Sequence, residues 1–182
     1  DMVYLFIGLV LMMLIAPIVS ILPGKSQKQI MAVRRAAMAR GISVELTTID
    51  DPSPDQDKYR TSTGRALPAK LQVAAYKGLS RLNSSSATLP AFQVQRTPGQ
   101  NPLSPDAFHS MTDASLSAPC RAFLGQYAAS LPTTVHQIIW DGRQLNVYWI
   151  EQPDHQMGEK IFTFIEEGLQ WLAEFSSISK AD

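Results

Sequence analysis

The sequence predicts an α+β protein in which one N-terminal transmembrane helix precedes a small domain, with a mainly antiparallel sheet covered by a C-terminal amphipathic helix. Three observations predict it. Residues 2–22 carry no charge, residues 133–152 form two β-rich runs around Asp-Gly, and apolar side chains recur at helical spacing from Ile161 to Phe175. The expected division of the 182 residues is an anchor over 1–23, a basic helix over 24–41 and one soluble domain over 42–182.

The first element is the uncharged run from Met2 to Leu22. A helix rising about 1.5 Å per residue would span roughly 30 Å over this run, which matches the hydrocarbon core of a bilayer. A cleaved signal peptide has basic residues before a shorter apolar run, whereas here Asp1 precedes the run and the cations follow it. A buried core helix would need a much larger domain to cover apolar side chains on every side. The run therefore predicts a membrane anchor.

The second element is a basic segment free of Gly and Pro that ends at Gly41 and contains no acidic residue. Its cations are the expected membrane-surface residues Lys25, Lys28, Arg34, Arg35 and Arg40. Because cytoplasmic flanks are enriched in Lys and Arg, we expect the N-terminus outside the cell (inner) membrane and the domain in the cytoplasm. The segment is interpreted either as an interfacial helix on anionic lipid or as a solvated helix whose cations only keep this flank in the cytoplasm.

The remaining domain has a different charge balance. The chain as a whole is neutral, but residues 41–182 hold 11 of the 16 basic residues and 15 of the 16 acidic ones. A mildly acidic domain gives no electrostatic support for a nucleic-acid partner. The single cysteine, Cys120, excludes an intramolecular disulfide and suits a reducing compartment.

Several short elements are expected between the basic helix and the hairpin. Residues 42–49 alternate apolar and polar side chains, which is typical of a half-buried strand, and 71–76 and 91–95 predict two more strands. Residues 118–130 predict a helix with Ser117 as its N-cap. The connecting segments are polar and rich in Ser, Thr, Pro and Gly, and we expect long loops at 50–68, 82–90 and 97–117.

The clearest local signal is a hairpin at Asp141-Gly142, a pair typical of a type I′ turn. With this pair as the two-residue turn, Trp140 faces Arg143, and a cation–π contact between them is expected to contribute about 0.5–1 kcal/mol. One face of the hairpin is mostly apolar, and the other face, which carries Tyr148, is partly polar. Trp140, Arg143 and Tyr148 are therefore the candidate interaction residues.

The last element is an amphipathic helix after Pro153. Its polar face includes Glu166 and Glu167, which suits solubility better than acid–base chemistry. We interpret its apolar stripe as domain core that covers a sheet, in preference to a partner-binding face. The stripe consists of Ile161, Phe164, Ile165, Leu169, Leu172 and Phe175.

No constellation of catalytic, cofactor-binding or metal-binding residues is evident in the sequence. His109, His136, His155 and Cys120 stand apart, without the spacing of a zinc site. The acidic loop Asp50–Asp57 lacks the sixth-position Gly and terminal Glu of an EF-hand. We therefore expect no enzymatic activity, no cofactor, no metal and no small-molecule substrate.

The expected function is that of a single-pass accessory, scaffold or assembly subunit of a larger membrane protein complex, acting through protein–protein contacts of its cytoplasmic domain. The layout resembles accessory subunits of bacterial inner-membrane machines in architecture only. One alternative is a membrane-tethered enzyme with a site built from Cys120, His136 and the Asp50–Asp57 loop, which a shared polar pocket would favour. Another is an anionic-lipid surface-binding module that uses residues 25–40.

Overall fold

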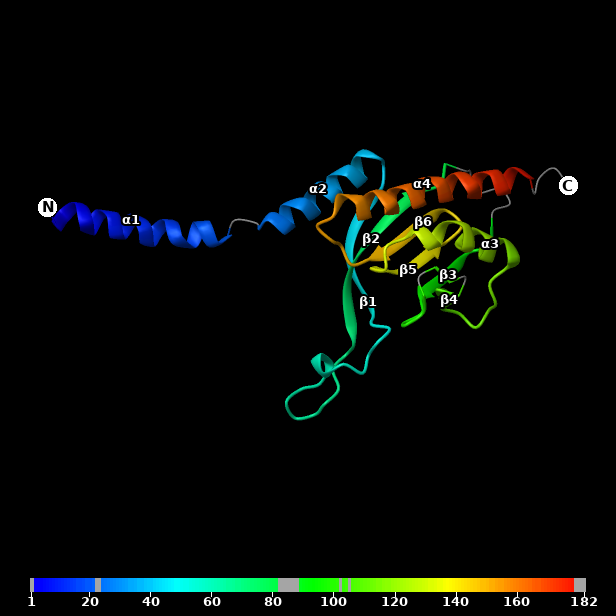
Figure 1. Ribbon diagram of the computed structural model, residues 1–182, viewed down its shortest axis with the longest axis horizontal. Coiled ribbons are helices and arrows are strands. Elements are labelled where there is room, and N and C mark those ends of the chain that lie inside the picture. Colours follow the sequence, from blue (N-terminus) through cyan, green and yellow to red (C-terminus); the bar gives the residue numbers. More distant parts are fainter. Residues whose placement is uncertain (1, 22–23, 82–88, 102, 105, 179–182) are drawn as a thin grey trace.

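The computed structural model describes residues 2–21, 24–81, 89–101, 103–104 and 106–178, which form an α+β domain preceded by a separate helix (Figure 1). The helices in these residues are α1 (Met2–Ile21), α2 (Lys25–Ala39), α3 (Ala118–Tyr127) and α4 (His155–Ile178). The strands are β1 (Ser43–Asp50), β2 (Lys70–Leu79), β3 (Phe92–Arg96), β4 (Phe108–Ser110), β5 (Val135–Trp140) and β6 (Gln144–Trp149). Short 3-10 turns cover Asp57–Tyr59 and Ala128–Ser130.

The strands form one sheet in the order β1-β2-β6-β5-β3-β4, and all neighbours are antiparallel. This confirms the expected α+β class with its antiparallel sheet. β1 pairs with β2 from Ser43 to Asp50, whereas β6 pairs only with the Ala74–Leu79 part of β2. The far halves of β1 and β2 therefore extend beyond the sheet as a two-stranded arm, residues 47–73, with a loop at its tip (Figure 1).

Helices α2, α3 and α4 pack against one face of the sheet, and the predicted apolar stripe of α4 is confirmed as core. Tyr76 of β2 stacks on Phe162 of α4, with ring centroids 6.1 Å apart. Gly78 allows the close approach of the helix, because a Cβ there would lie 2.3 Å from Cγ2 of Ile165. Close packing of this kind makes the sheet and α4 one rigid unit.

The β5–β6 hairpin is confirmed, but its turn lies one residue later than expected. Gly142 has a φ of +92° and occupies the first central position, followed by Arg143, which is the type II′ arrangement. Asp141 precedes the turn, and its carboxylate accepts the N–H groups of Arg143 and Gln144 at 2.8 and 2.6 Å. The side-chain bonds of Asp141 therefore move the turn centre.

The shifted turn corrects the expectation for Trp140. It pairs with Leu145 instead of Arg143, so the register moves by two residues and the side chains from Gln137 to Trp149 keep their predicted faces. Trp140 is 0% exposed, and its indole N–H donates to the carbonyl of Leu89 at 2.9 Å. Trp140 is therefore a core residue, and its ring makes no contact at the surface.

A bulge near the start of β5 also departs from simple alternation. Val135 pairs with Trp149 and Gln137 pairs with Tyr148, so His136 is the extra residue between them. The bulge buries Val135 in the core, on the face where alternation had placed His136. It leaves His136 half-buried outside that face.

Two of the predicted loops are only partly loops of the described structure. The segment 97–117 contains β4, which was not predicted and which pairs with β3. Part of the predicted loop 82–90, at 82–88, lies outside the described residues. The expected cap of α3 is present, because the Ser117 hydroxyl accepts the N–H of Cys120 at 3.4 Å.

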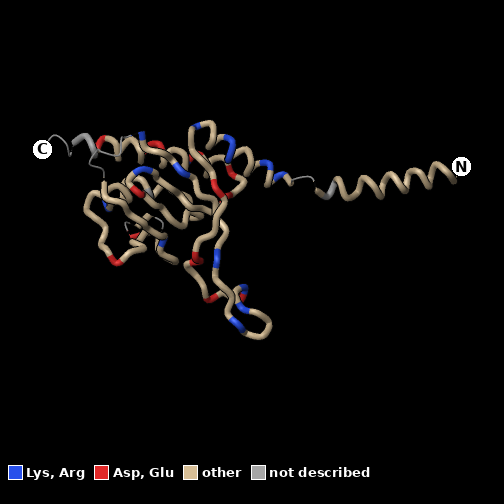
Figure 2. The backbone as a smooth tube through the Cα atoms, turned by 180° about the vertical axis from the view of Figure 1, so that it is seen from behind, with Lys and Arg blue, Asp and Glu red and all other residues tan. Residues whose placement is uncertain are grey.

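Helix α1 projects away from the domain (Figure 1), and its side chains from Met2 to Ile18 are all exposed. Figure 2 shows no charged residue along the described part of α1, whereas Lys and Arg residues recur along α2. Among the residues that the structure describes, no helix combines the length and the apolarity required to cross a membrane.

Candidate functional site

Helix α2, which joins α1 to the sheet, is an integral part of the domain. Its Val33 and Ala37 are buried in the core. Gly158 of α4 makes room for Val33, since a Cβ at position 158 would lie 2.7 Å from Cγ1 of Val33. An apolar face that is buried inside the domain cannot also insert among lipid head groups. This burial limits any contact of α2 with lipid to its exposed polar side.

A half-buried ion pair fastens α2 to the far end of β6. Nε of Arg34 donates to both carboxylate oxygens of Glu151, at 2.8 and 3.1 Å. The hydroxyl of Tyr76 donates to the same carboxylate at 2.9 Å. The Glu151 side chain is 8% exposed and that of Arg34 is 29% exposed. These three residues, which we call the Arg34 triad, connect α2, β2 and the segment after β6.

The electrostatics of the Arg34 triad agree with its geometry. The hydrogen bond to Glu151 raises the pKa of Arg34 above its ordinary value. Burial raises the pKa of Tyr76, and the neighbouring Glu151 carboxylate raises it further. Tyr76 is therefore a neutral hydrogen-bond donor at any physiological pH, which is what a carboxylate acceptor requires.

A second link ties the end of α2 to α4. The Arg40 guanidinium lies 3.0 Å from a carboxylate oxygen of Glu159 and 3.8 Å from one of Glu166, and it sits over the Phe162 ring at 5.3 Å. All three charged side chains are more than one third exposed, so this link adds little stability by itself. Its importance is positional, because it directs the C-terminal end of α2 onto α4.

The five cations predicted to meet the membrane thus divide into two groups. Arg34 and Arg40 turn toward acidic partners within the domain. Lys25, Lys28 and Arg35 are exposed and form no ion pair among the described residues. Only these three remain free to contact lipid head groups.

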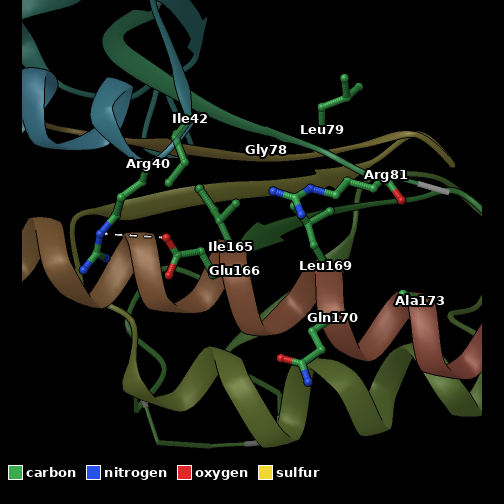
Figure 3. Close-up of a pocket in the computed structure, with 12 residues that line it drawn as sticks. Arg40, Ile42, Gly78, Leu79, Arg81, Ile165, Glu166, Leu169, Gln170 and Ala173 are labelled. Carbon is green, nitrogen blue, oxygen red and sulfur yellow. Dashed lines mark ion pairs between the residues drawn. The ribbon is translucent and has the colours of Figure 1, made fainter.

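A groove of about 510 Å³ lies between the end of β2, the α2–β1 junction and α4 (Figure 3). Ile42, Ile165 and Leu169 give it an apolar wall, and Leu79 beside it is 52% exposed. Figure 3 shows the Arg40–Glu166 ion pair at one end and Arg81 at the other. The lining holds one carboxylate, Glu166, which pairs with Arg40, and one hydroxyl, Ser80, with no histidine among its residues, so the groove suits binding better than chemistry.

The residues named for an enzymatic site are only partly brought together. Asp51 and His136 line one cavity, whereas Cys120 lines another. Burial raises the pKa of the Cys120 thiol to about 11, so the thiol is protonated and inaccessible near neutral pH. Within the described part of the chain, no group of three His, Cys, Asp or Glu side chains could hold a metal ion.

The predicted interaction residues have different surroundings. Trp140 is buried, as described above, and is not available to a partner. Arg143 is exposed at the hairpin turn, and Tyr148 is half-buried on the sheet face opposite the helices. The ion pair that sequence reasoning missed, Arg34 with Glu151, joins residues 117 positions apart and has no local signature.

Comparison of the chain with family models, with curated proteins and with solved structures found no match.

Proposed function

We propose that this protein is a single-pass, membrane-anchored accessory, scaffold or assembly subunit of a larger membrane protein complex. One observation carries the proposal: from Met2 to Ile18, α1 presents exposed, uncharged, mostly apolar side chains, and none of them belongs to the domain core. A surface of this kind marks a contact with lipid or protein. The proposed span is the whole sequence run from Met2 to Leu22, which extends past the described end of α1.

The domain is proposed to work close to the membrane surface on the cytoplasmic side. Cations that follow a span favour retention of that flank in the cytoplasm, and five of them follow this one. The Arg34 triad holds α2 to the sheet, and α2 begins only a few residues after α1 along the sequence. A partner bound to the domain would then lie close to the bilayer surface.

Two observations make the alternative functions less favourable. The only thiol is buried and lies apart from His136, which weakens the proposal of a tethered enzyme. The apolar face of α2 is occupied by α4, which weakens the proposal of a lipid-surface module. Contact with a protein partner needs neither feature.

The test compares the full chain with a variant that lacks residues 1–23. We expect the full chain to stay with membranes through alkaline carbonate extraction and to copurify with a defined set of proteins in mild detergent. The truncated variant should appear in the soluble fraction and lose those proteins. A matched control changes Lys25, Lys28 and Arg35 to Gln in the full chain, and it should remain membrane-bound.

Two outcomes would contradict the proposal. One is recovery of the intact full chain as a soluble monomer without detergent. The other is a truncated variant that still copurifies with the same membrane partners, since the anchor would then not be what places the protein.

A further inference from the structure

A second, smaller cavity of about 260 Å³ lies where the base of the arm meets β5 and the segment after β3. Its charged and titratable side chains come from three separate parts of the chain. Asp51 and Lys58 belong to the arm, Arg96 ends β3, and His136 is the bulged residue of β5. The arm, which otherwise projects from the sheet, therefore forms one side of this open cavity, whose charged groups lie beside apolar ones.

Arg96 is the central group of this cavity. Its Nε donates to the carbonyl of Val135 at 2.7 Å, its Nη2 donates to the carbonyl of Pro132 at 3.1 Å, and its guanidinium lies 4.6 Å from the centre of the Phe108 ring. A guanidinium has five N–H donors, so three are left over. No carboxylate of the described residues pairs with it, and burial lowers its pKa.

The one carboxylate in the lining, Asp51, is already used within the arm. One oxygen accepts the N–H of Ser53 at 2.8 Å, and the other accepts the hydroxyl of Tyr59 at 2.6 Å and lies 3.4 Å from Nζ of Lys58. The hydrogen bond from Tyr59 is the largest cause that lowers the pKa of Asp51, and the carboxylate therefore stays ionised. With His136 neutral, two cations face this single carboxylate, and the uncompensated charge is that of Arg96.

We propose that this cavity binds a single oxyanion, held by the free N–H groups of Arg96 and by His136. A half-buried cation without a counter-ion is unfavourable, and a planar guanidinium matches carboxylate and tetrahedral oxyanions in two-point hydrogen bonds. The cavity is smaller than the roughly 300–1,000 Å³ typical of drug-sized ligands, which suits one anionic group. The anion is either a tetrahedral oxyanion or a carboxylate.

His136 gives the site a pH dependence with a definite sign. Burial, and then the nearby Arg96 charge, lower its pKa, while Asp51 opposes them. Lys58 is the other charged group that lines the cavity. Without a ligand His136 is neutral at neutral pH. A bound anion favours the protonated imidazole, so affinity should rise as the pH falls from about 8 to about 5.

The test follows thermal unfolding of the full chain in a neutral detergent while sodium sulfate, or separately sodium acetate, replaces sodium chloride at constant ionic strength. A ligand that binds the folded state raises the midpoint in a saturable way. We expect such a rise, about tenfold weaker binding in Arg96→Gln, and unchanged binding in the control Arg143→Gln. A response to sulfate indicates a site for a tetrahedral oxyanion, and a response to acetate alone indicates a site for a carboxylate.

His136→Asn provides an independent variant in case Arg96→Gln fails to fold, since Arg96 also holds two backbone carbonyls. At about pH 8 this variant should bind the anion with the affinity of the wild type. Its affinity should not increase as the pH falls toward about 5. The proposal is overturned by the absence of a saturable response to either anion, by equal responses in Arg96→Gln and wild type, or by an unchanged pH dependence in His136→Asn.

Discussion

The Arg34 triad offers the sharpest quantitative prediction, because one substitution removes the acceptor of two donors. In Glu151→Gln, the Arg34 guanidinium loses its ionic partner, and only one side-chain oxygen remains to accept from either Arg34 or Tyr76. The change keeps the size and shape of the side chain, so packing around it is preserved. Any loss of stability then reports on the triad and not on a cavity.

The magnitude follows from how far the triad is buried. Breaking a fully buried ion pair costs about 3–5 kcal/mol and breaking an exposed one costs about 1 kcal/mol or less. Glu151 is 8% exposed and Arg34 is 29% exposed, so the pair lies between these limits. We expect Glu151→Gln to lower the free energy of unfolding by about 2–3 kcal/mol, and Tyr76→Phe to lower it by about 1 kcal/mol.

The assay is urea unfolding of the full chain in a neutral detergent, followed by tryptophan fluorescence. Trp140 and Trp149 are both fully buried and report on the core. A double-mutant cycle of Arg34→Gln and Glu151→Gln should show a coupling of at least about 1 kcal/mol. Additive losses, within about 0.5 kcal/mol, would refute the reasoning that the triad holds α2 to the sheet.

Three further outcomes are expected. Gly78→Ala should destabilise the protein by roughly 1–3 kcal/mol in the same urea assay, because its Cβ would lie 2.3 Å from Ile165; Gly125→Ala, in helix α3 with nothing within 4 Å, should be neutral or stabilising. Cys120 should resist a thiol reagent near neutral pH until the protein unfolds, and fast labelling would contradict its burial. The folded-state pKa of Asp51 is lowered, so its contribution to stability is present above the unfolded pKa of about 3.9 and is lost as the pH falls through the folded value. In Asp51→Asn, the free energy of unfolding should therefore fall less steeply as the pH is lowered. An unchanged fall would contradict the lowered pKa of Asp51.

Elements with strong local periodicity were predictable from the sequence. The stripe of α4 from Ile161 to Leu172 forms the core, as expected, and the β5–β6 hairpin lies where its turn residues placed it. Its register was wrong by two residues, because the side chain of Asp141 bonds the backbone ahead of it. A two-residue shift preserves the faces of a strand, so the core residues beyond the bulge, such as Ile138, Trp140 and Leu145, were still identified.

Features that depend on long-range contacts were not predictable. The bulge at His136 moves Val135 into the core, although the alternation of the sequence assigns the opposite faces. The three residues of β4 are too few to show periodicity, and they form a strand only because β3 is beside them. Tertiary pairing overrides local pattern in both cases.

The basic helix shows most clearly how an interpretation from composition can be incomplete. A run of cations after an apolar segment suggested contact with lipid, and the sequence gives no sign that Arg34 and Arg40 have acidic partners far along the chain. The weak apolar face of α2 also gave little indication that α4 covers it. The cavity around Arg96 was missed for the same reason, since its lining comes from three distant segments.

The most direct test of the proposed membrane topology is a pair of reporters fused in turn to the C-terminus of the full chain. One reporter fluoresces only when it folds in the cytoplasm, and the other is a phosphatase that is active only after export. Retention of the flank that carries Lys25, Lys28 and Arg35 predicts a fluorescent fusion and an inactive phosphatase. An active phosphatase together with a dark fluorescent fusion would place the domain on the opposite side of the membrane and contradict the account.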